Sequence, residues 1–203
     1  MGLGGLARAM NKSHFRITKT EVMAKGWSSL SRLTVDATMR DGRKLELKRE
    51  VADHGHGAAI LPIDVKRGTC LLVRQWRAGA AFNGDNAFLI EACAGLLDAD
   101  DPIGCARREA FEELGTHVND ISHVSDCYSS PGAVSEKISL YLGHYSSQDR
   151  VASGGGLLEE GEDIEVLEMP IEEAYSMIAA GTILDAKTII LLQYIKIQMI
   201  TSL

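Results

Sequence analysis

The chain has 203 residues, 45% of them hydrophobic, which suffices for one domain with a sizeable core and a small appendage. Its 21 Lys and Arg against 28 Asp and Glu give a net charge of -7, which argues against binding through bulk attraction to nucleic acid or anionic lipid. An anionic ligand would have to be held by a few placed cations or through a divalent metal. We therefore expect neither a nucleic-acid nor a membrane partner.

The cysteines and the apolar segments indicate the compartment in which the protein is expected. The four cysteines form no C-x-x-C pair, so a zinc knuckle or disulfide framework is not indicated, and a reducing cytoplasm is expected. The most apolar segment, 188–200, contains Gln193, Lys196 and Gln198, and is too short for the roughly 20 apolar residues of a spanning helix. It is typical of a buried C-terminal helix. Residues 1–12 have no signal-peptide core and are expected to be disordered.

Residues 13–53 predict a small N-terminal β subdomain. Segments 32–38 and 44–50 alternate in the manner of strands, and the turn signal 40–42 joins them. So small a sheet has little core of its own. We therefore expect it to pack on the rest of the chain or on a second copy, and a homodimer is the expected assembly.

Residues 54–203 predict an α/β sandwich with a mixed sheet. Short apolar strands are expected at 58–63, 70–73, 88–90, 139–142 and 164–169, with one strongly charged helix after the third. Two further helices are expected from Ile171 and from about Asp185.

The charged helix has clear ends. Asp101 can cap its first N–H groups, Pro102 suits the first helical position, and Gly115 is a natural stop. At about 100° per residue the helix has two faces. The expected buried face holds Ile103, Ala106, Ala110, Phe111 and Leu114, and the opposite arc holds Arg108, Glu109, Glu112 and Glu113. Arg107 falls on the apolar side and has no assigned place.

The carboxylate stripe has two interpretations. It can be an ordinary solvated helix face. Alternatively, Glu109 and Glu113, which lie one turn apart and repel each other, can hold Mg²⁺ between them. The glycine-bearing, acidic segment 95–101 before the helix favours the second interpretation, because it leaves backbone carbonyls free to face a metal.

Together these two pieces resemble the Nudix box, which runs Gly, five residues, Glu, seven residues, then Arg-Glu-apolar-x-Glu-Glu-x-Gly. The matching residues are Gly95, Arg108, Glu109, Glu112, Glu113 and Gly115. Asp101 replaces the first Glu, and the stretch from Gly95 to Arg108 is one residue shorter than usual. Segments 74–77, 94–98, 130–132 and 162–166 resemble the branch that cleaves ADP-ribose and nucleotide sugars. The greatest likeness is to the GDP-mannose hydrolase type, through the shortened box and segments 48–51, 154–156 and 185–188.

The resemblance implies a Nudix α/β/α sandwich with a divalent metal, Mg²⁺ or alternatively Mn²⁺. The implied metal ligands are Glu109, Glu113, Glu162 and the backbone carbonyl of Ala94. Glu112 would bind a further ion or support these ligands, and Arg108 would orient a glutamate. The general base is expected on the acidic segment 158–163, where Glu160 matches best; the alternative is a flexible loop without a role. The glycines 154–156 could let this loop close, or could be a linker.

The resemblance also implies the substrate contacts. Arg77 would clamp phosphate with Lys187 as a second cation, Ala94 would line the site, and Glu136 would bind the sugar side or a water. Trp27 would stack on the base, and Lys48, Arg49 and Glu50 would line the nucleotide site, partly from the neighbouring subunit. Alternatively, Trp27 takes part in ordinary packing of the small sheet, and the charges of the strand form its solvated face. Glu136 would then be a loop carboxylate without a role. The six histidines show no metal-ligand spacing and are assigned structural roles.

The expected reaction is Mg²⁺-dependent hydrolysis of a nucleotide sugar, GDP-mannose giving GMP and mannose 1-phosphate. Two alternatives remain. One is hydrolysis of ADP-ribose to AMP and ribose 5-phosphate, and the other is a nucleotide-binding sensor without catalysis.

Overall fold

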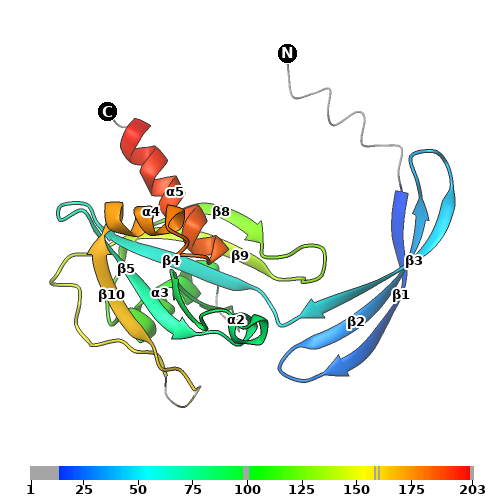
Figure 1. The fold of residues 1–203 in the computed structure, drawn as a ribbon, viewed down its shortest axis with the longest axis horizontal. Coiled ribbons are helices and arrows are strands. Elements are labelled where there is room, and N and C mark those ends of the chain that lie inside the picture. The colour runs from blue at the N-terminus through cyan, green and yellow to red at the C-terminus, as the bar shows by residue number, and fades with distance from the viewer. Residues whose placement is uncertain (1–13, 98–100, 158, 160, 202–203) are drawn as a thin grey trace. The chain divides into compact units, whose positions relative to one another are not determined.

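The computed structural model describes residues 14–97, 101–157, 159 and 161–201, which form two compact units (Figure 1). The first unit runs to residue 54 and includes 130–136, and the second contains 55–129 and 137 onward. The sequence did not indicate that 130–136 belongs with the first unit. The disorder expected for residues 1–12 concerns residues outside the described part, and the expected division into domains stays a prediction.

The first unit is an antiparallel sheet in the order β1-β2-β3. Its strands are β1 (His14–Lys25), β2 (Ser29–Thr38) and β3 (Lys44–Asp53). One face carries ion pairs such as Arg16–Asp36 at 3.1 Å and Arg32–Glu50 at 2.9 Å. Segment 130–136 adds to the end of β3, where Ala52 N donates to the carbonyl of residue 133 at 2.8 Å.

The second unit is built on a mixed seven-stranded sheet in the order β10-β5-β4-β9-β8, in which β6 pairs with β5 and β7 with β4. The strands are β4 (Gly57–Asp64), β5 (Thr69–Trp76), β6 (Phe88–Glu91), β7 (Cys93–Leu96), β8 (Asn119–Tyr128), β9 (Lys137–His144) and β10 (Glu165–Pro170). β4 and β9 are parallel. β4 and β5 pair only at 63–64 with 69–70, and β6 and β7 pair with the parts that diverge.

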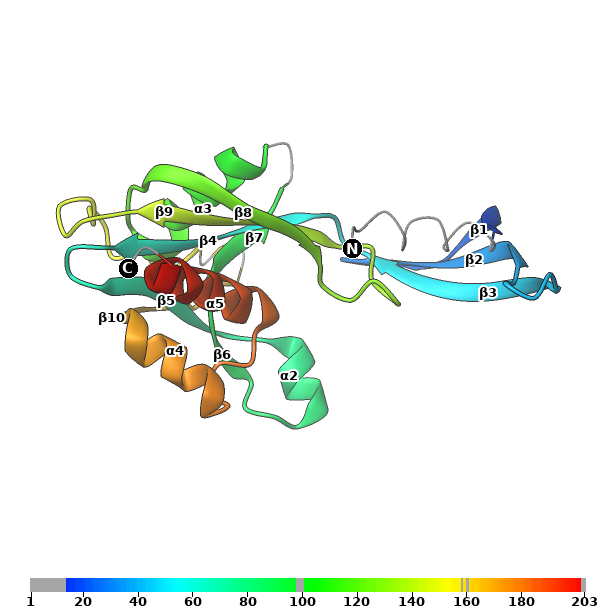
Figure 2. The ribbon, with the colours of Figure 1, turned by 90° about the horizontal axis from the view of Figure 1, so that it is seen from above.

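Helices cover both faces of this sheet. They are α2 (Ala78–Asn83), α3 (Pro102–Leu114), α4 (Ile171–Ala179) and α5 (Ala186–Thr201). Alternate residues of β4 point to opposite sides: Ala59, Leu61 and Ile63 join the core under α4 and α5, whereas Ala58 and Ile60 join the core under α3. Figure 2 shows α3 on one side of the sheet and α4 and α5 on the other. The predicted α/β sandwich with a mixed sheet is confirmed.

Three elements were not anticipated from the sequence. The sequence of β8 does not alternate regularly, because its register with β9 shifts twice, between 119 and 122 and between 123 and 125. β7 lies in the segment 95–101 that was interpreted as loop, and α2 is a single short helix of mostly small residues. No helix in the described part of the chain is long and apolar enough to cross a bilayer.

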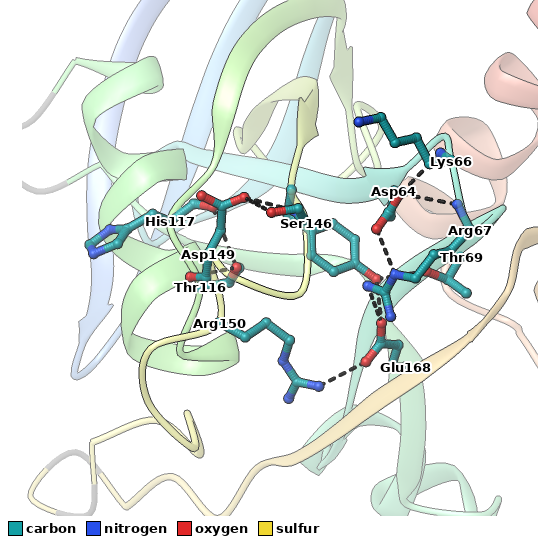
Figure 3. A network of polar contacts seen from close by, with 11 residues as sticks. Asp64, Lys66, Arg67, Thr69, Thr116, His117, Ser146, Asp149, Arg150 and Glu168 are labelled. Atoms are coloured by element: carbon teal, nitrogen blue, oxygen red, sulfur yellow. Dashed lines mark hydrogen bonds and ion pairs between the residues drawn. The ribbon is translucent and has the colours of Figure 1, made fainter.

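A polar network ties the β4–β5 turn to β10 (Figure 3). Glu168 accepts from Arg67 at 2.6 Å, from Arg150 at 2.9 Å and from the Tyr145 hydroxyl at 2.9 Å. Arg67 also pairs with Asp64 at 2.6 Å. The network joins residues far apart in the chain at one edge of the sheet.

Candidate active site

Helix α3 begins and ends where the sequence predicted. The Asp101 side chain accepts from Gly104 N at 2.7 Å, and Pro102 is the first helical residue. Gly115 ends the helix in the left-handed conformation at φ 65°. The Nudix-like stripe therefore lies on one uninterrupted helix.

The predicted buried face of α3 is confirmed for Ala106, Ala110 and Leu114 and wrong for Ile103 and Phe111. Glu109 and Glu113 are only 7% and 1% exposed, whereas Ile103 and Phe111 are 44% and 43% exposed. The buried set is Cys105, Ala106, Glu109, Ala110, Glu113 and Leu114. Small residues let the helix pack closely on the sheet, and this turns the two glutamates toward β7 instead of solvent. Arg107, which had no predicted place, donates to the Val118 carbonyl at 3.1 Å.

Strand β7 provides the surface that receives the two glutamates. Glu113 Oε2 accepts from Ala94 N at 3.2 Å. A β-carbon built on Gly95 would lie 1.8 Å from Glu109 Oε1, so only glycine leaves room for that carboxylate. The close approach explains why glycine stands at the start of the Nudix-like pattern.

Burial strongly affects the charge of both glutamates. Burial, followed by the proximity of Glu112 and Glu162, raises the pKa of Glu109 to about 7 against the opposing effect of Arg108. Burial, with Glu109 and Glu162 nearby, also raises the pKa of Glu113 to about 7, although a hydrogen bond from Cys93 opposes the shift. The fold thus concentrates carboxylates where their ionised forms are disfavoured.

Arg108 links two of the glutamates on α3. Its Nη1 lies 2.7 Å from Glu109 Oε1 and 2.9 Å from Glu112 Oε2. Its Nη2 donates to the Leu96 carbonyl at 3.3 Å. These contacts fit the expected role of Arg108 in orienting a glutamate against β7.

The glycines 154–156 pack on the C-terminal end of α3. Gly155 N donates to the Glu113 carbonyl at 2.9 Å, and a β-carbon on Gly156 would lie 2.4 Å from Glu162 Oε2. Glu162 is held by Leu157 N at 2.8 Å. In this arrangement the glycines serve as a close-packed cap, and they bring Glu162 within electrostatic reach of the helix glutamates. Glu160, the expected base, lies outside the described residues.

The donor set fits a hard divalent cation. The contacts of Glu113 are with Ala94 N and the Cys93 thiol, neither of which is a cation that would compensate a buried carboxylate. Carboxylate oxygens are the ligands that Mg²⁺ prefers. Among the residues that the structure describes, no three acidic, histidine or cysteine side chains enclose an ion by themselves. Backbone oxygen, substrate phosphate and water would therefore have to complete the coordination.

The two expected phosphate cations meet at one carboxylate in the same unit. Arg77 and Lys187 both bind Glu91. Arg77 also lies within electrostatic reach of Glu113. The structure thus brings together Arg77, Lys187, Glu109 and Glu113, which come from three separate parts of the chain.

The expected nucleotide-binding residues lie in the first unit. Trp27 is 80% exposed, and one face of its indole stacks on His54 with ring centroids 5.0 Å apart. His54 Nε2 lies 3.3 Å from Glu136 Oε1, so the stack connects Trp27 to Glu136. On β3, Glu50 pairs with Arg32.

The other two expected residues of β3 lie on the surface of the strand. Lys48 and Arg49 are both exposed, and Arg49 Nη1 donates to the Lys48 carbonyl at 2.8 Å. Their exposure agrees both with a place in the nucleotide site and with an ordinary solvated strand face.

Sequence reasoning missed two residues of these groups. Glu91 ends a short strand without any local motif, and His54 was grouped with histidines of no assigned function. Their partners lie far away in the sequence: Lys187 for Glu91, and Trp27 and Glu136 for His54. No spacing rule within the sequence could have joined them.

Comparison with known proteins agrees with this geometry. The NUDIX domain family model matches residues 53–190. The chain is 42% identical over 181 residues to the GDP-mannose pyrophosphatases of Escherichia coli strain K12 and strain HS, covering 89% of this chain and 94% of each relative. The chain belongs to the NUDIX domain family.

Proposed function

We propose that this protein is a Nudix pyrophosphohydrolase that hydrolyses the pyrophosphate of a nucleotide sugar, with GDP-mannose as the substrate. The products are GMP and mannose 1-phosphate. The observation that carries the proposal is the buried pair Glu109–Glu113 against Ala94 and Gly95, within electrostatic reach of Arg77. The 42% identity to curated GDP-mannose pyrophosphatases supports the choice of substrate.

Different residues of the second unit would bind the metal, orient the phosphates and accept a proton. Glu109, Glu113, Glu162 and the Ala94 carbonyl would hold Mg²⁺, which supplies charge neutralisation of the phosphate oxygens and activation of a water. Arg77 orients the diphosphate, because a guanidinium donates several charge-assisted hydrogen bonds. Lys187 adds positive charge beside it while its ammonium binds Glu91 and Asp185. A carboxylate of segment 158–163 accepts the proton of the attacking water. The new bond joins the water oxygen to phosphorus, and the bridging P–O bond breaks.

The first unit would supply the nucleotide contacts. Trp27 offers an open indole face for a base, and His54 supports its other face. Glu136 would accept from a hydroxyl of the sugar side, and Lys48, Arg49 and Glu50 would line the nucleotide site.

A homodimer is supported by the apolar face of the N-terminal sheet. Phe15 and Ile17 of β1 are exposed, whereas the β2 residues in register with them, Ala37 and Val35, are buried. Exposed large apolar side chains that lie together mark a surface for protein–protein contact. A second copy of the chain would cover it.

Product analysis tests the reaction directly. The protein is incubated with Mg²⁺ and, separately, GDP-mannose, ADP-ribose, NADH and other nucleotide sugars, and products are identified by chromatography. We expect GMP and mannose 1-phosphate in equal amounts from GDP-mannose, with the greatest kcat/KM in the panel. A higher kcat/KM for ADP-ribose would identify ADP-ribose as the substrate in place of GDP-mannose. Binding without turnover of any compound in the panel would identify the protein as a nucleotide sensor.

A further inference from the structure

Glu91, the last residue of β6, holds two cations at once. Its side chain is only 3% exposed. Arg77 Nε and Nη2 donate to its two oxygens at 2.7 and 2.9 Å, and Lys187 Nζ donates to Oε2 as well. Burial raises the pKa of Glu91, but its pairing with Arg77 and Lys187 outweighs this and holds the pKa below its usual value. Glu91 is therefore a buried anion at neutral pH.

The backbone of Arg77 is fixed independently of its side chain. Arg77 is the N-cap of α2, its carbonyl accepts from Ala81 N at 3.1 Å, and its own N–H donates to the Ala87 carbonyl at 2.7 Å. The two-pronged contact with Glu91 then fixes the rotation of the guanidinium, because it uses the Nε–Nη2 edge. The Nη1 group lies outside this edge and can donate to a phosphate oxygen.

The other side of Glu91 is anchored to α5. Lys187 Nζ also donates to Asp185 Oδ1 at 3.0 Å, and Asp185 Oδ2 accepts from Thr188 N at 3.0 Å. Thr188 Oγ1 in turn accepts from Ala92 N, next to Glu91, at 2.6 Å. The start of α5 is thus tied to the junction of β6 and β7, and Glu91 cannot move without breaking several buried bonds.

We propose that Glu91 is a positioning residue for phosphate binding, which holds the Arg77 guanidinium in the orientation that receives a diphosphate beside Glu109 and Glu113. The inference rests on the proposed function only in taking a diphosphate as the ligand. Lys187 and Asp185 act through Glu91 as its anchor. A carboxylate that merely neutralised buried cations would have the opposite effect on affinity, because its removal would leave the site more positive and tighten anion binding.

The test measures binding of inorganic pyrophosphate with Mg²⁺ by calorimetry for wild type, Glu91→Gln, Arg77→Ala and the double variant. Glu91→Gln should weaken binding roughly 10- to 100-fold, because removing a partner that orients a ligand-binding residue typically costs about that much in affinity. In the Arg77→Ala background the same change should have less than about a twofold effect, as expected when two residues act as one unit. With GDP-mannose the loss should appear in KM, with kcat little changed.

A matched control removes a different bridging carboxylate. Glu168→Gln also leaves two arginines without their shared partner, Arg67 and Arg150, at the edge of the sheet (Figure 3). It should lower the melting temperature and leave pyrophosphate affinity within about twofold. A loss equal to that of Glu91→Gln would mean general loosening of the fold and would overturn the proposal.

Other outcomes are equally decisive. Unchanged or tighter pyrophosphate binding by Glu91→Gln, an equal loss in both backgrounds, or no pyrophosphate binding by wild type would overturn the proposal. If Glu91→Gln does not fold, Arg77→Lys replaces it, since lysine keeps the charge but not the fork. Weakened binding by Arg77→Lys supports the proposal and wild-type affinity contradicts it. Turnover of GDP-mannose by wild type decides the proposed function separately.

Discussion

Glu109 Oε1 occupies the space in which a β-carbon of residue 95 would stand, 1.8 Å from that position on Gly95. The backbone of β7 and a buried carboxylate of α3 therefore touch only because residue 95 has no side chain. The relationship joins the first residue of the Nudix-like pattern to one of its glutamates. Substitution of Gly95 therefore tests whether the position of Glu109 matters for activity.

Gly95→Ala should abolish most turnover with little loss of stability. The methyl group would clash with the buried Glu109 side chain and not with backbone atoms, so that side chain has to shift. We expect kcat/KM for GDP-mannose to fall roughly 100-fold, because the displaced group no longer meets the reacting geometry. Gly79→Ala, which meets nothing within 4 Å on helix α2, is the control and should keep wild-type kinetics. Normal turnover by Gly95→Ala would remove Glu109 from the site.

Glu113→Gln should separate metal binding from folding. Glu113 is 1% exposed, so neutralising it removes a buried charge and the metal-free protein should be at least as stable as wild type. Mg²⁺ at ten times its Kd stabilises wild type by about 1.4 kcal/mol, and this increment should vanish in the variant together with turnover. Thermal melts with Mg²⁺ and with a chelator measure it. An unchanged Mg²⁺ shift would exclude Glu113 as a ligand.

Trp27→Ala should raise KM for GDP-mannose and leave kcat nearly unchanged. Stacking of a base on an aromatic ring contributes about 1–3 kcal/mol, and Trp27 offers one open face while His54 covers the other. Trp27→Phe keeps a flat ring and should retain most of the affinity. Quenching of Trp27 emission by GMP, measured in a Trp76→Phe background, gives a direct readout. Equal KM values for the alanine variant and wild type would mean ordinary packing.

The N-terminal sheet should mediate dimerisation. Sedimentation at micromolar concentration should give twice the 22.0 kDa chain mass for wild type. Ile17→Asp places a charge on the apolar face of β1 and should yield monomers, whereas Arg16→Ser alters the opposite face and should not. Wild-type protein with the mass of a single chain would contradict the homodimer.

Asp126 should contribute to stability in a pH-dependent manner. Hydrogen bonds from His123 and Ser139, with Lys137 nearby, lower its pKa from 3.8 to about 2 against a small opposing effect of burial. A native pKa below the unfolded value means that the contribution is present above pH 3.8 and is lost as the pH falls through about 2. The melting temperature of wild type should therefore exceed that of Asp126→Asn at pH 6, and the difference should close toward pH 2. A constant difference would contradict the assignment.

The sequence by itself determined the local features of the fold. Asp101, Pro102 and Gly115 fixed the ends of α3 because helix capping depends on neighbouring residues only. Alternation predicted the hairpin of β2 and β3, and the spacing of Arg108, Glu109, Glu112 and Glu113 predicted the family.

Only the tertiary structure decided which groups of these elements meet. The rotation of α3 depends on how closely Ala106 and Ala110 approach the sheet, which no angular count reveals. The contact of Arg77 and Lys187 with Glu91 depends on β6 and β7 pairing where β4 and β5 diverge. Long-range contacts are set by packing of whole layers and not by sequence spacing. The sequence therefore named the residue types of the candidate site, whereas the tertiary structure decided how they are oriented.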